Sequence, residues 1–323
     1  MAVPTVDLTD APELVGAQLD AACSDIGFVQ IIGHGLDAAL ESSAWSMAQR
    51  FFALSDGAKL AVAIPEGDAY GYGAYQVERL AASRGGITPA DMKETFSIGP
   101  FVDPADVADV IASDPAAAFA YSPNRWPADL SEMTAVMHAY YDALGDLAAR
   151  LLSLMARGLG MDPATFESSI DRHTSALRLL HYPHIDPATA EPGQLRAGAH
   201  SDYGTLTLLR QDDAPGGLEV LDRNGEWHLV PAHPGAYVVN IGDALERWTN
   251  GRWRSTLHRV QLPPADAAGN ERFSIAFFHN ANWDAVIDCL DACRPHDVST
   301  LAPPITAGRH LMERFRSTQA NES

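Results

Sequence analysis

The sequence contains two His-x-Asp pairs in one short stretch, "HID" at 184–186 and "HSD" at 200–202. A histidine and a carboxylate can hold one divalent metal ion when both side chains point the same way. In a β-strand, residues i and i+2 face the same side, about 6.5–7 Å apart. A metal site is therefore expected at whichever pair lies at or enters a strand.

The second pair has the better local context. His200 and Asp202 precede "YGTLTLL", a run rich in leucine and β-branched residues that predicts a strand. The first pair lies between Pro183 and Pro187, and proline cannot donate to a strand ladder. That pair is expected in a turn or loop, where Asp186 caps backbone amides. His200 and Asp202 are thus the favoured metal ligands.

Two later strand-like runs add a third ligand and an anion site. His258 lies in "STLHRVQL", and two histidines with one carboxylate are the ligand set of non-haem Fe(II) oxygenases. Arg272 and Ser274 share one strand face in "RFSIAFF", and a planar guanidinium suits a carboxylate. Taken singly, His258 is more commonly a strand histidine bonded to a carbonyl, and Arg272 a surface ion pair. Together these residues predict a metal ion and a carboxylate clamp in one cavity.

The rest of the sequence predicts a mainly β protein with flanking helices. Apolar residues recur every three or four positions over 129–159, which predicts a long helix, and a shorter helix is expected over 11–26. From about residue 175, short β-rich runs alternate with Pro/Gly/Asn/Asp turns, a spacing typical of a jelly roll. The expected parts are a mixed α/β N-terminal region on the substrate side (1–125), a spine helix (126–170), a jelly-roll catalytic core (171–290) and a C-terminal helix and tail (291–323).

Composition and charge restrict the partners of the chain. Its 22 Lys and Arg against 42 Asp and Glu give a formal net charge of −20, which argues against nucleic acid or an anionic membrane as partner. Neither a signal peptide nor an apolar run of about 18 residues is found. Cys23, Cys289 and Cys293 are expected to be free thiols. We therefore expect a cytoplasmic protein, monomeric or weakly dimeric, that acts on a small molecule.

The ordered set of motifs resembles one known family nearly from end to end. "VPTVDL" and "ACSDIGFVQIIGHGL" are similar to its N-terminal opening, and "FFALSDGAKL", "GYGAY", "DMKETFSIG" and "NRWP" to its later N-terminal landmarks. "RLLHYP", "AHSDYGTLTLL", "GGLEV", "VVNIGDALERWTNGRWRSTLHRV" and "RFSIAFF" are similar to its core. On these motifs the chain resembles the isopenicillin N synthase-like family of Fe(II)- and 2-oxoglutarate-dependent dioxygenases. The resemblance implies a double-stranded β-helix (jelly-roll) core with a helical N-terminal part.

The same resemblance implies roles for particular residues. Leu180 stands where the family has the Asn of Asn-x-Tyr-Pro, so any hydrogen bond from that side chain is absent here. The pair at 184–186 matches no ligand position. The matching positions are His200, Asp202 and His258 for the iron ligands, Arg272 and Ser274 for the Arg-x-Ser that binds the distal carboxylate of 2-oxoglutarate, and Tyr182 for the tyrosine that supports it.

The implied reaction uses Fe(II), 2-oxoglutarate and O2, releases succinate and CO2, and hydroxylates, desaturates or cyclises an amino-acid-like or secondary-metabolite substrate. Isopenicillin N synthase and aminocyclopropanecarboxylate oxidase keep the Arg-x-Ser without using 2-oxoglutarate, so a four-electron oxidase is the alternative. A metal-binding protein of the same shape without oxygenase activity is a third. Residues expected to face the substrate are Tyr70, Tyr72, Tyr75, Arg79, Arg84, Phe96, Phe278 and Asn280.

Overall fold

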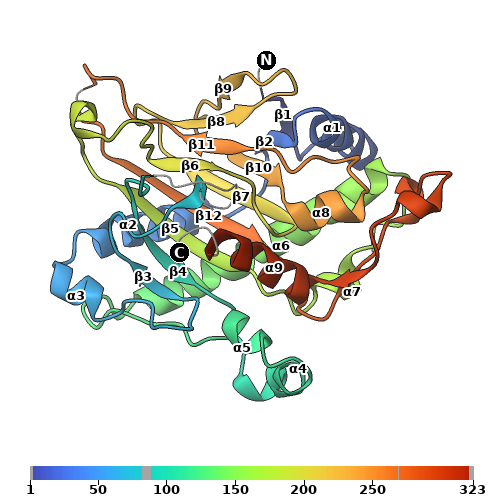
Figure 1. Cartoon of the computed structure of the whole chain (residues 1–323), viewed down its shortest axis with the longest axis horizontal. Coiled ribbons are helices and arrows are strands. Elements are labelled where there is room, and N and C mark those ends of the chain that lie inside the picture. The colour runs from blue at the N-terminus through green and yellow to red at the C-terminus, as the bar shows by residue number, and fades with distance from the viewer. Residues whose placement is uncertain (1–2, 82–88, 268, 320–323) are drawn as a thin grey trace.

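Two stacked β-sheets form the centre of the molecule, and helices cover the outer side of the larger one (Figure 1). The structure, a computed structural model, describes residues 3–81, 89–267 and 269–319. The strands are β1 (Thr5–Asp7), β2 (Phe28–Ile32), β3 (Gly71–Gly73), β4 (Glu94–Ile98), β5 (Ala176–Tyr182), β6 (Ala197–His200), β7 (Leu206–Gln211), β8 (Leu218–Leu221), β9 (Trp227–Leu229), β10 (Tyr237–Ile241), β11 (His258–Val260), β12 (Arg272–His279), β13 (Val286–Ile287) and β14 (Ile305–Thr306). The helices are α1 (Pro12–Asp25), α2 (Ala38–Phe52), α3 (Asp56–Leu60), α4 (Ala108–Ser113), α5 (Ala117–Ala120), α6 (Met133–Gly158), α7 (Glu167–Ile170), α8 (Asp243–Trp248) and α9 (Ala307–Gln319).

The larger sheet has eight strands in the order β1-β2-β10-β7-β12-β5-β4-β3, and the smaller has four in the order β6-β11-β8-β9. All pairs in these sheets are antiparallel except β1 with β2. Strands from the first hundred residues thus extend both edges of a sheet whose centre comes from the C-terminal half. The division into parts at 125, 170 and 290 remains a prediction.

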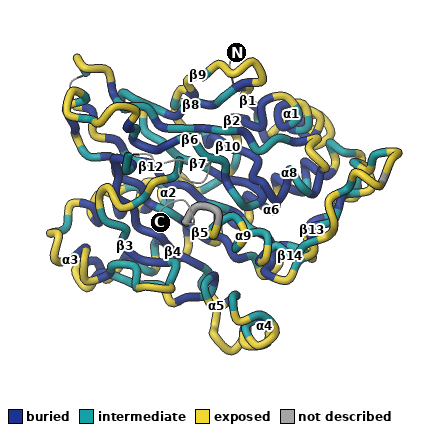
Figure 2. The backbone as a smooth tube through the Cα atoms, in the orientation of Figure 1, coloured by how far each residue is buried: buried dark blue, intermediate teal, exposed yellow. Residues whose placement is uncertain are grey.

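The central strands of the larger sheet have one side toward the helices and one toward the smaller sheet, because successive side chains alternate. On β5, Leu177 and Leu179 belong to the main hydrophobic core with α1, α2 and α6. Leu180 and Tyr182 instead pack with Ala197 of the smaller sheet. Figure 2 shows buried backbone along the sheets and much exposed backbone in α3 and α4. The space between the sheets is therefore where residues of both can meet.

The long helix α6 supports the larger sheet from its outer side. Its apolar stripe from Met133 to Leu154 is buried as predicted, and the helix ends at Gly158. Helix α1 crosses it at two glycines: a Cβ on Gly16 would lie 2.7 Å from the carbonyl oxygen of Leu154, and one on Gly158 would lie 2.2 Å from that of Gly16. Any larger residue at either position would push the helices apart.

Candidate metal centre and cosubstrate pocket

Three potential metal ligands meet between the sheets. His200 is the last residue of β6, and its register partner His258 is the first residue of β11, so the two rings lie side by side with centroids 4.3 Å apart. Asp202 follows two residues after β6, in the connection to β7. We expected His200 and Asp202 at the strand that follows; instead His200 ends β6, which the sequence did not predict, and Asp202 lies outside any strand.

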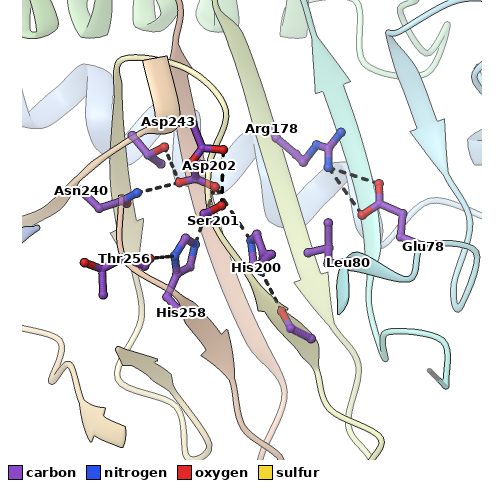
Figure 3. A network of polar contacts seen from close by, with 12 residues as sticks. Glu78, Leu80, Arg178, His200, Ser201, Asp202, Asn240, Asp243, Thr256 and His258 are labelled. Atoms are coloured by element: carbon purple, nitrogen blue, oxygen red, sulfur yellow. Dashed lines mark hydrogen bonds and ion pairs between the residues drawn. The ribbon is translucent and has the colours of Figure 1, made fainter. Parts of the chain in front are cut away.

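The ligand atoms of these three residues face a common point (Figure 3). Oδ1 of Asp202 lies 3.6 Å from Nε2 of His258 and 3.9 Å from Nε2 of His200. All three atoms lie within 4.8 Å of one another. We call His200, Asp202 and His258 the triad. Its spacing suits one metal ion bound by two imidazoles and a carboxylate.

Hydrogen bonds to the opposite atoms of these side chains fix their orientation. Nδ1 of His200 lies 2.7 Å from the carbonyl oxygen of Gly198, and Nδ1 of His258 lies 3.1 Å from that of Thr256. Because a carbonyl can only accept, each Nδ1 carries the proton, which leaves a lone pair on Nε2 for a metal.

Asp202 is held in the same way. Its Oδ2 accepts hydrogen bonds from Oγ1 of Thr207 at 2.6 Å and from Nδ2 of Asn240 at 2.7 Å. Oδ1 is thereby turned toward the two histidines.

The electrostatics also favour a cation at this point. Burial, together with the neighbouring His258, lowers the pKa of His200, which keeps its imidazole neutral. Burial alone would raise the pKa of Asp202, but the two histidines and the hydrogen bonds from Asn240 and Thr207 outweigh it and lower that pKa. An ionised, buried carboxylate thus lies beside the neutral imidazole of His200 and favours a cation at this point. The donor set fits Fe(II), which accepts nitrogen and oxygen ligands while keeping positions open.

A buried arginine is the first residue of β12 and lies beside the same space. Arg272 is only 1% exposed, and its Nη2 donates to Oε1 of Gln211 at 2.7 Å and its Nη1 to Oγ of Ser274 at 3.4 Å. Its Nε has no hydrogen-bond partner, although Oδ1 of Asp212 lies 3.9 Å away. Tyr182 is its register partner on β5, and Cζ of Arg272 lies 5.0 Å from the centre of the tyrosine ring. A buried guanidinium with an unused donor is suited to bind a carboxylate.

The residues expected to face the substrate divide between the two sides of the larger sheet. Tyr72 and Phe96 pack in the helix-side core with Phe51, so the structure does not bring them to the triad. Tyr70 is also buried, and its hydroxyl donates to the carbonyl of Ala120.

The others lie elsewhere. Phe278 packs beside Leu180 on the triad side, and Tyr75 is 37% exposed. Nδ2 of Asn280 donates to the carbonyl of Thr174. Arg79 lies in the chain between β3 and β4, and Arg84 lies outside the described residues.

Sequence reasoning missed a charged pair on the triad side. Nη1 of Arg178 lies 3.2 Å from Oε1 of Glu78 (Figure 3). The guanidinium also lies over the ring of Phe278, with Cζ 5.9 Å from the ring centre. Burial would raise the pKa of Glu78, but Arg178 and Lys93 lower it to about 2, so the pair is ionised. The signal was present in the sequence, because Arg178 precedes Tyr182 by four residues on one predicted strand and so shares its face.

Comparisons with known proteins agree with this arrangement. The 2OG-Fe(II) oxygenase superfamily matches residues 173–281, and the family described as non-haem dioxygenase in morphine synthesis N-terminal matches residues 3–129. A 2-oxoglutarate-Fe(II) type oxidoreductase of Aspergillus fumigatus is 36% identical over 92% of this chain and 85% of its own. Validamycin A dioxygenase of Streptomyces hygroscopicus subsp. limoneus is 31% identical over 92% of this chain and 79% of its own.

Solved structures show the same fold. A full-length Neurospora crassa protein, crystallised in complex with alpha-KG and thymine, superposes with a TM-score of 0.84 at 28% identity, over 98% of this chain and 97% of that one. A 2OG-Fe(II) oxygenase family protein of Caulobacter crescentus gives a TM-score of 0.84 at 32% identity, over 98% and 99%.

The chain belongs to the family of Fe(II)- and 2-oxoglutarate-dependent dioxygenases. It is an oxidoreductase that uses Fe(II) and 2-oxoglutarate. The predicted family, jelly-roll fold, activity and cofactors are thereby confirmed.

No helix in the described ranges is long and apolar enough to cross a lipid bilayer. The cytoplasmic location, the oligomeric state and the exclusion of nucleic acid remain predictions.

Proposed function

We propose that the chain oxidises a C–H bond of a small polar molecule, with iron bound by His200, Asp202 and His258. The observation that carries this proposal is the set of free ligand atoms: each histidine donates through Nδ1 to a carbonyl, and Asp202 uses only Oδ2 in hydrogen bonds. Bound Fe(II) supplies an O2-activating redox centre, and 2-oxoglutarate supplies two electrons as it is converted to succinate and CO2.

The cosubstrate is proposed to lie with its distal carboxylate on Arg272 and Ser274, beside Tyr182. Support comes from the unpartnered Nε of Arg272 and from the shared strand face of Arg272 and Ser274. Gln211 holds the guanidinium by its Nη2, so its direction is set before the ligand arrives. The carboxylate meets a donor that is already oriented, which lowers the entropic cost of binding.

The substrate is proposed to lie against Arg178, Glu78 and Phe278. Arg178 donates through Nε to Oγ of Ser97 and through Nη1 to Glu78, while its side chain stays 25% exposed. Arg178 presents a positive charge and Glu78 a negative charge to a substrate, and Phe278 presents an aromatic face. Relatives named for homoarginine and validamycin A, and a neighbouring structure that holds thymine, support a small polar substrate.

The test is reconstitution with Fe(II) and 2-oxoglutarate in the presence of pools of amino acids, nucleobases and other small polar molecules. Mass spectrometry identifies the substrate by gain of one oxygen atom or loss of two hydrogen atoms, and succinate formation must rise with it in equal amount. Oxidation of a substrate with O2 uptake but no succinate would overturn the proposal in favour of the four-electron oxidase.

A further inference from the structure

Arg196 is a fully buried arginine that forms no direct ion pair with the described residues; the acidic group that acts on it is Asp212. Its exposed fraction is 0%. The guanidinium donates to the carbonyls of Pro215, at 2.7 Å, of Gly216, at 3.3 Å, and of Asn270. Its Nε has no hydrogen-bond partner, and Arg196 forms no ion pair with a carboxylate of the described chain. Fully buried arginines are almost always paired, so this charge calls for an anion from elsewhere.

The location of Arg196 indicates which anion that is. The residue directly precedes β6 and so lies four positions before His200. Its Cζ lies 5.9 Å from the centre of the Tyr182 ring, the same ring that Arg272 approaches to 5.0 Å. Two guanidiniums therefore share one tyrosine in the proposed cosubstrate pocket.

The charges around this tyrosine do not balance. Asp212 is the acidic group beside Arg272, with Oδ1 3.9 Å from Nε, and burial raises the pKa of its carboxyl. Burial and the nearby Arg272 lower the pKa of Arg196 to about 10, which still leaves it protonated at neutral pH. Among the described residues, the two guanidiniums thus share the one carboxyl of Asp212, and the pair of cations keeps a net positive charge.

We propose that Arg196 is a second cation of the cosubstrate pocket, which favours 2-oxo acids with a distal carboxylate over 2-oxo acids that end in a methyl group. Arg272 offers the oriented hydrogen-bond donors. Arg196 adds electrostatic attraction for the distal carboxylate without a direct hydrogen bond to it. This inference rests on the proposed function, because it assumes that the distal carboxylate lies on Arg272.

Arg196 also has a structural task that any test must separate from binding. Its bonds to the carbonyls of Pro215 and Asn270 join the loops before β8 and before β12. Loss of those bonds would loosen the pocket for any 2-oxo acid, charged at its far end or not. A measurement of affinity for one 2-oxo acid therefore cannot separate the two roles. The ratio of affinities for a 2-oxo acid with a distal carboxylate and one without it can, because only the binding role changes that ratio.

Three variants separate the roles. Arg196→Lys keeps the positive charge but loses the planar set of guanidinium donors, and Arg196→Met and Arg196→Gln lose the charge. Gln retains a donor for one carbonyl, so it serves if Met does not fold. Arg150→Met is a control for the loss of arginine-to-carbonyl bonds away from the pocket, because the exposed Arg150 donates to the carbonyls of His34 and Leu8. Calorimetric titration of Mn(II)-loaded protein with 2-oxoglutarate and with 2-oxopentanoate gives the ratio of the two dissociation constants.

In Arg196→Met and Arg196→Gln the preference for 2-oxoglutarate should fall by about ten- to a hundredfold, the effect of a unit charge several ångströms away at an effective dielectric constant near 20. Arg196→Lys and Arg150→Met should stay close to the wild-type ratio. Equal weakening of both oxo acids in all three Arg196 variants would overturn the inference and leave only the loop role. If the wild-type protein shows no preference for 2-oxoglutarate over 2-oxopentanoate, the proposal that Arg272 binds the distal carboxylate is wrong, and with it the premise of this inference.

Discussion

The described part of the chain contains two clusters of potential metal ligands that look alike in composition and differ in chemistry. One is the triad. The other, which we call the hairpin cluster, consists of Asp222 and Glu226 in the turn between β8 and β9 and of His228 in β9. In the hairpin cluster, Oδ1 of Asp222 accepts from the backbone amides of Asn224 and Glu226, and Oδ2 lies 2.9 Å from Nε2 of His228. Both carboxylate oxygens are already used to close the turn.

The triad has its hydrogen bonds on the atoms that face away from the centre. Nδ1 of each histidine and Oδ2 of Asp202 are bonded, whereas the two Nε2 atoms and Oδ1 face one another. Burial differs as well, because Glu226 is exposed and the triad lies between two sheets. Residue types and proximity alone therefore do not distinguish a metal site from a turn. The distinguishing feature is a set of ligand atoms that have no other hydrogen-bond partners and face the same buried point.

The largest expected effect separates these two clusters directly. His200→Ala, Asp202→Ala and His258→Ala should each abolish turnover and iron retention, because each removes one of three protein ligands. Asp222→Ala and His228→Ala should keep both, as should His184→Ala. Iron content after dialysis and succinate formation are the measurements. Loss of iron from a hairpin variant with retention in His200→Ala would reverse the assignment.

The next effect concerns the cosubstrate. Arg272→Ala should raise the 2-oxoglutarate requirement by about one and a half to three and a half decades, since removing one partner of a buried charge pair costs roughly 2–5 kcal/mol. Arg272→Lys should restore part of this, because it offers a point charge without the fork. Ser274→Ala should cost at most about 1.5–3 kcal/mol, the range for one hydrogen bond to a charged group.

Iron content serves as the control for these variants and should not change. Succinate formation is measured against 2-oxoglutarate concentration in each of them. If Arg272→Ala leaves that dependence untouched and weakens substrate binding, the arginine holds the substrate.

Most of the fold and the central cluster could be read from the sequence because their signals are local. The apolar stripe of α6 and the turn-separated strands follow from periodicity, and His200-x-Asp202 with His258 from spacing and flanking residues. The first pair lies outside any strand, as expected, in a loop: His184 and Asp186 are exposed, and Asp186 caps a short 3-10 helix by accepting a hydrogen bond from the amide of Ala188. Proline on both sides was sufficient to predict this.

What could not be read depends on pairing between distant strands. Tyr72 and Phe96 lie in the stretch expected near the substrate, but the register of β3, β4 and β5 turns them toward the helices. Arg178 faces the other side through that same register, where Ser97 is its partner. A shift of one residue would exchange the two sets, and no local pattern fixes that choice.

A smaller effect is expected from the residues that orient the triad. Asn240→Ala removes one of two hydrogen bonds to Oδ2 of Asp202 and should lower iron affinity by about 10- to 100-fold, as is usual for partners of metal ligands. Asn282→Ala is the matched control, because Asn282 is buried and hydrogen-bonded to Asp171 near α7, away from the triad. Titration with Fe(II) under anaerobic conditions gives both affinities. Equal iron affinity in the two variants would show that Thr207 alone suffices to hold Asp202.

The smallest effect lies in the hairpin cluster and tests whether its carboxylate serves the turn. Backbone hydrogen bonds from Glu226, then the bond with His228, lower the pKa of Asp222 to about 2. A carboxyl whose pKa is lowered on folding stabilises the protein above its unfolded pKa, about 3.9, and loses that contribution as the pH falls toward the folded value. Asp222→Asn keeps an acceptor oxygen but cannot ionise. The difference in free energy of unfolding between wild type and Asp222→Asn should therefore be constant from neutral pH to about 5, and shrink below about pH 4. Urea unfolding at several pH values, repeated with and without EDTA, measures it. A difference that EDTA removes at neutral pH would mean that the hairpin cluster binds a metal after all, and the contrast with the triad would not hold.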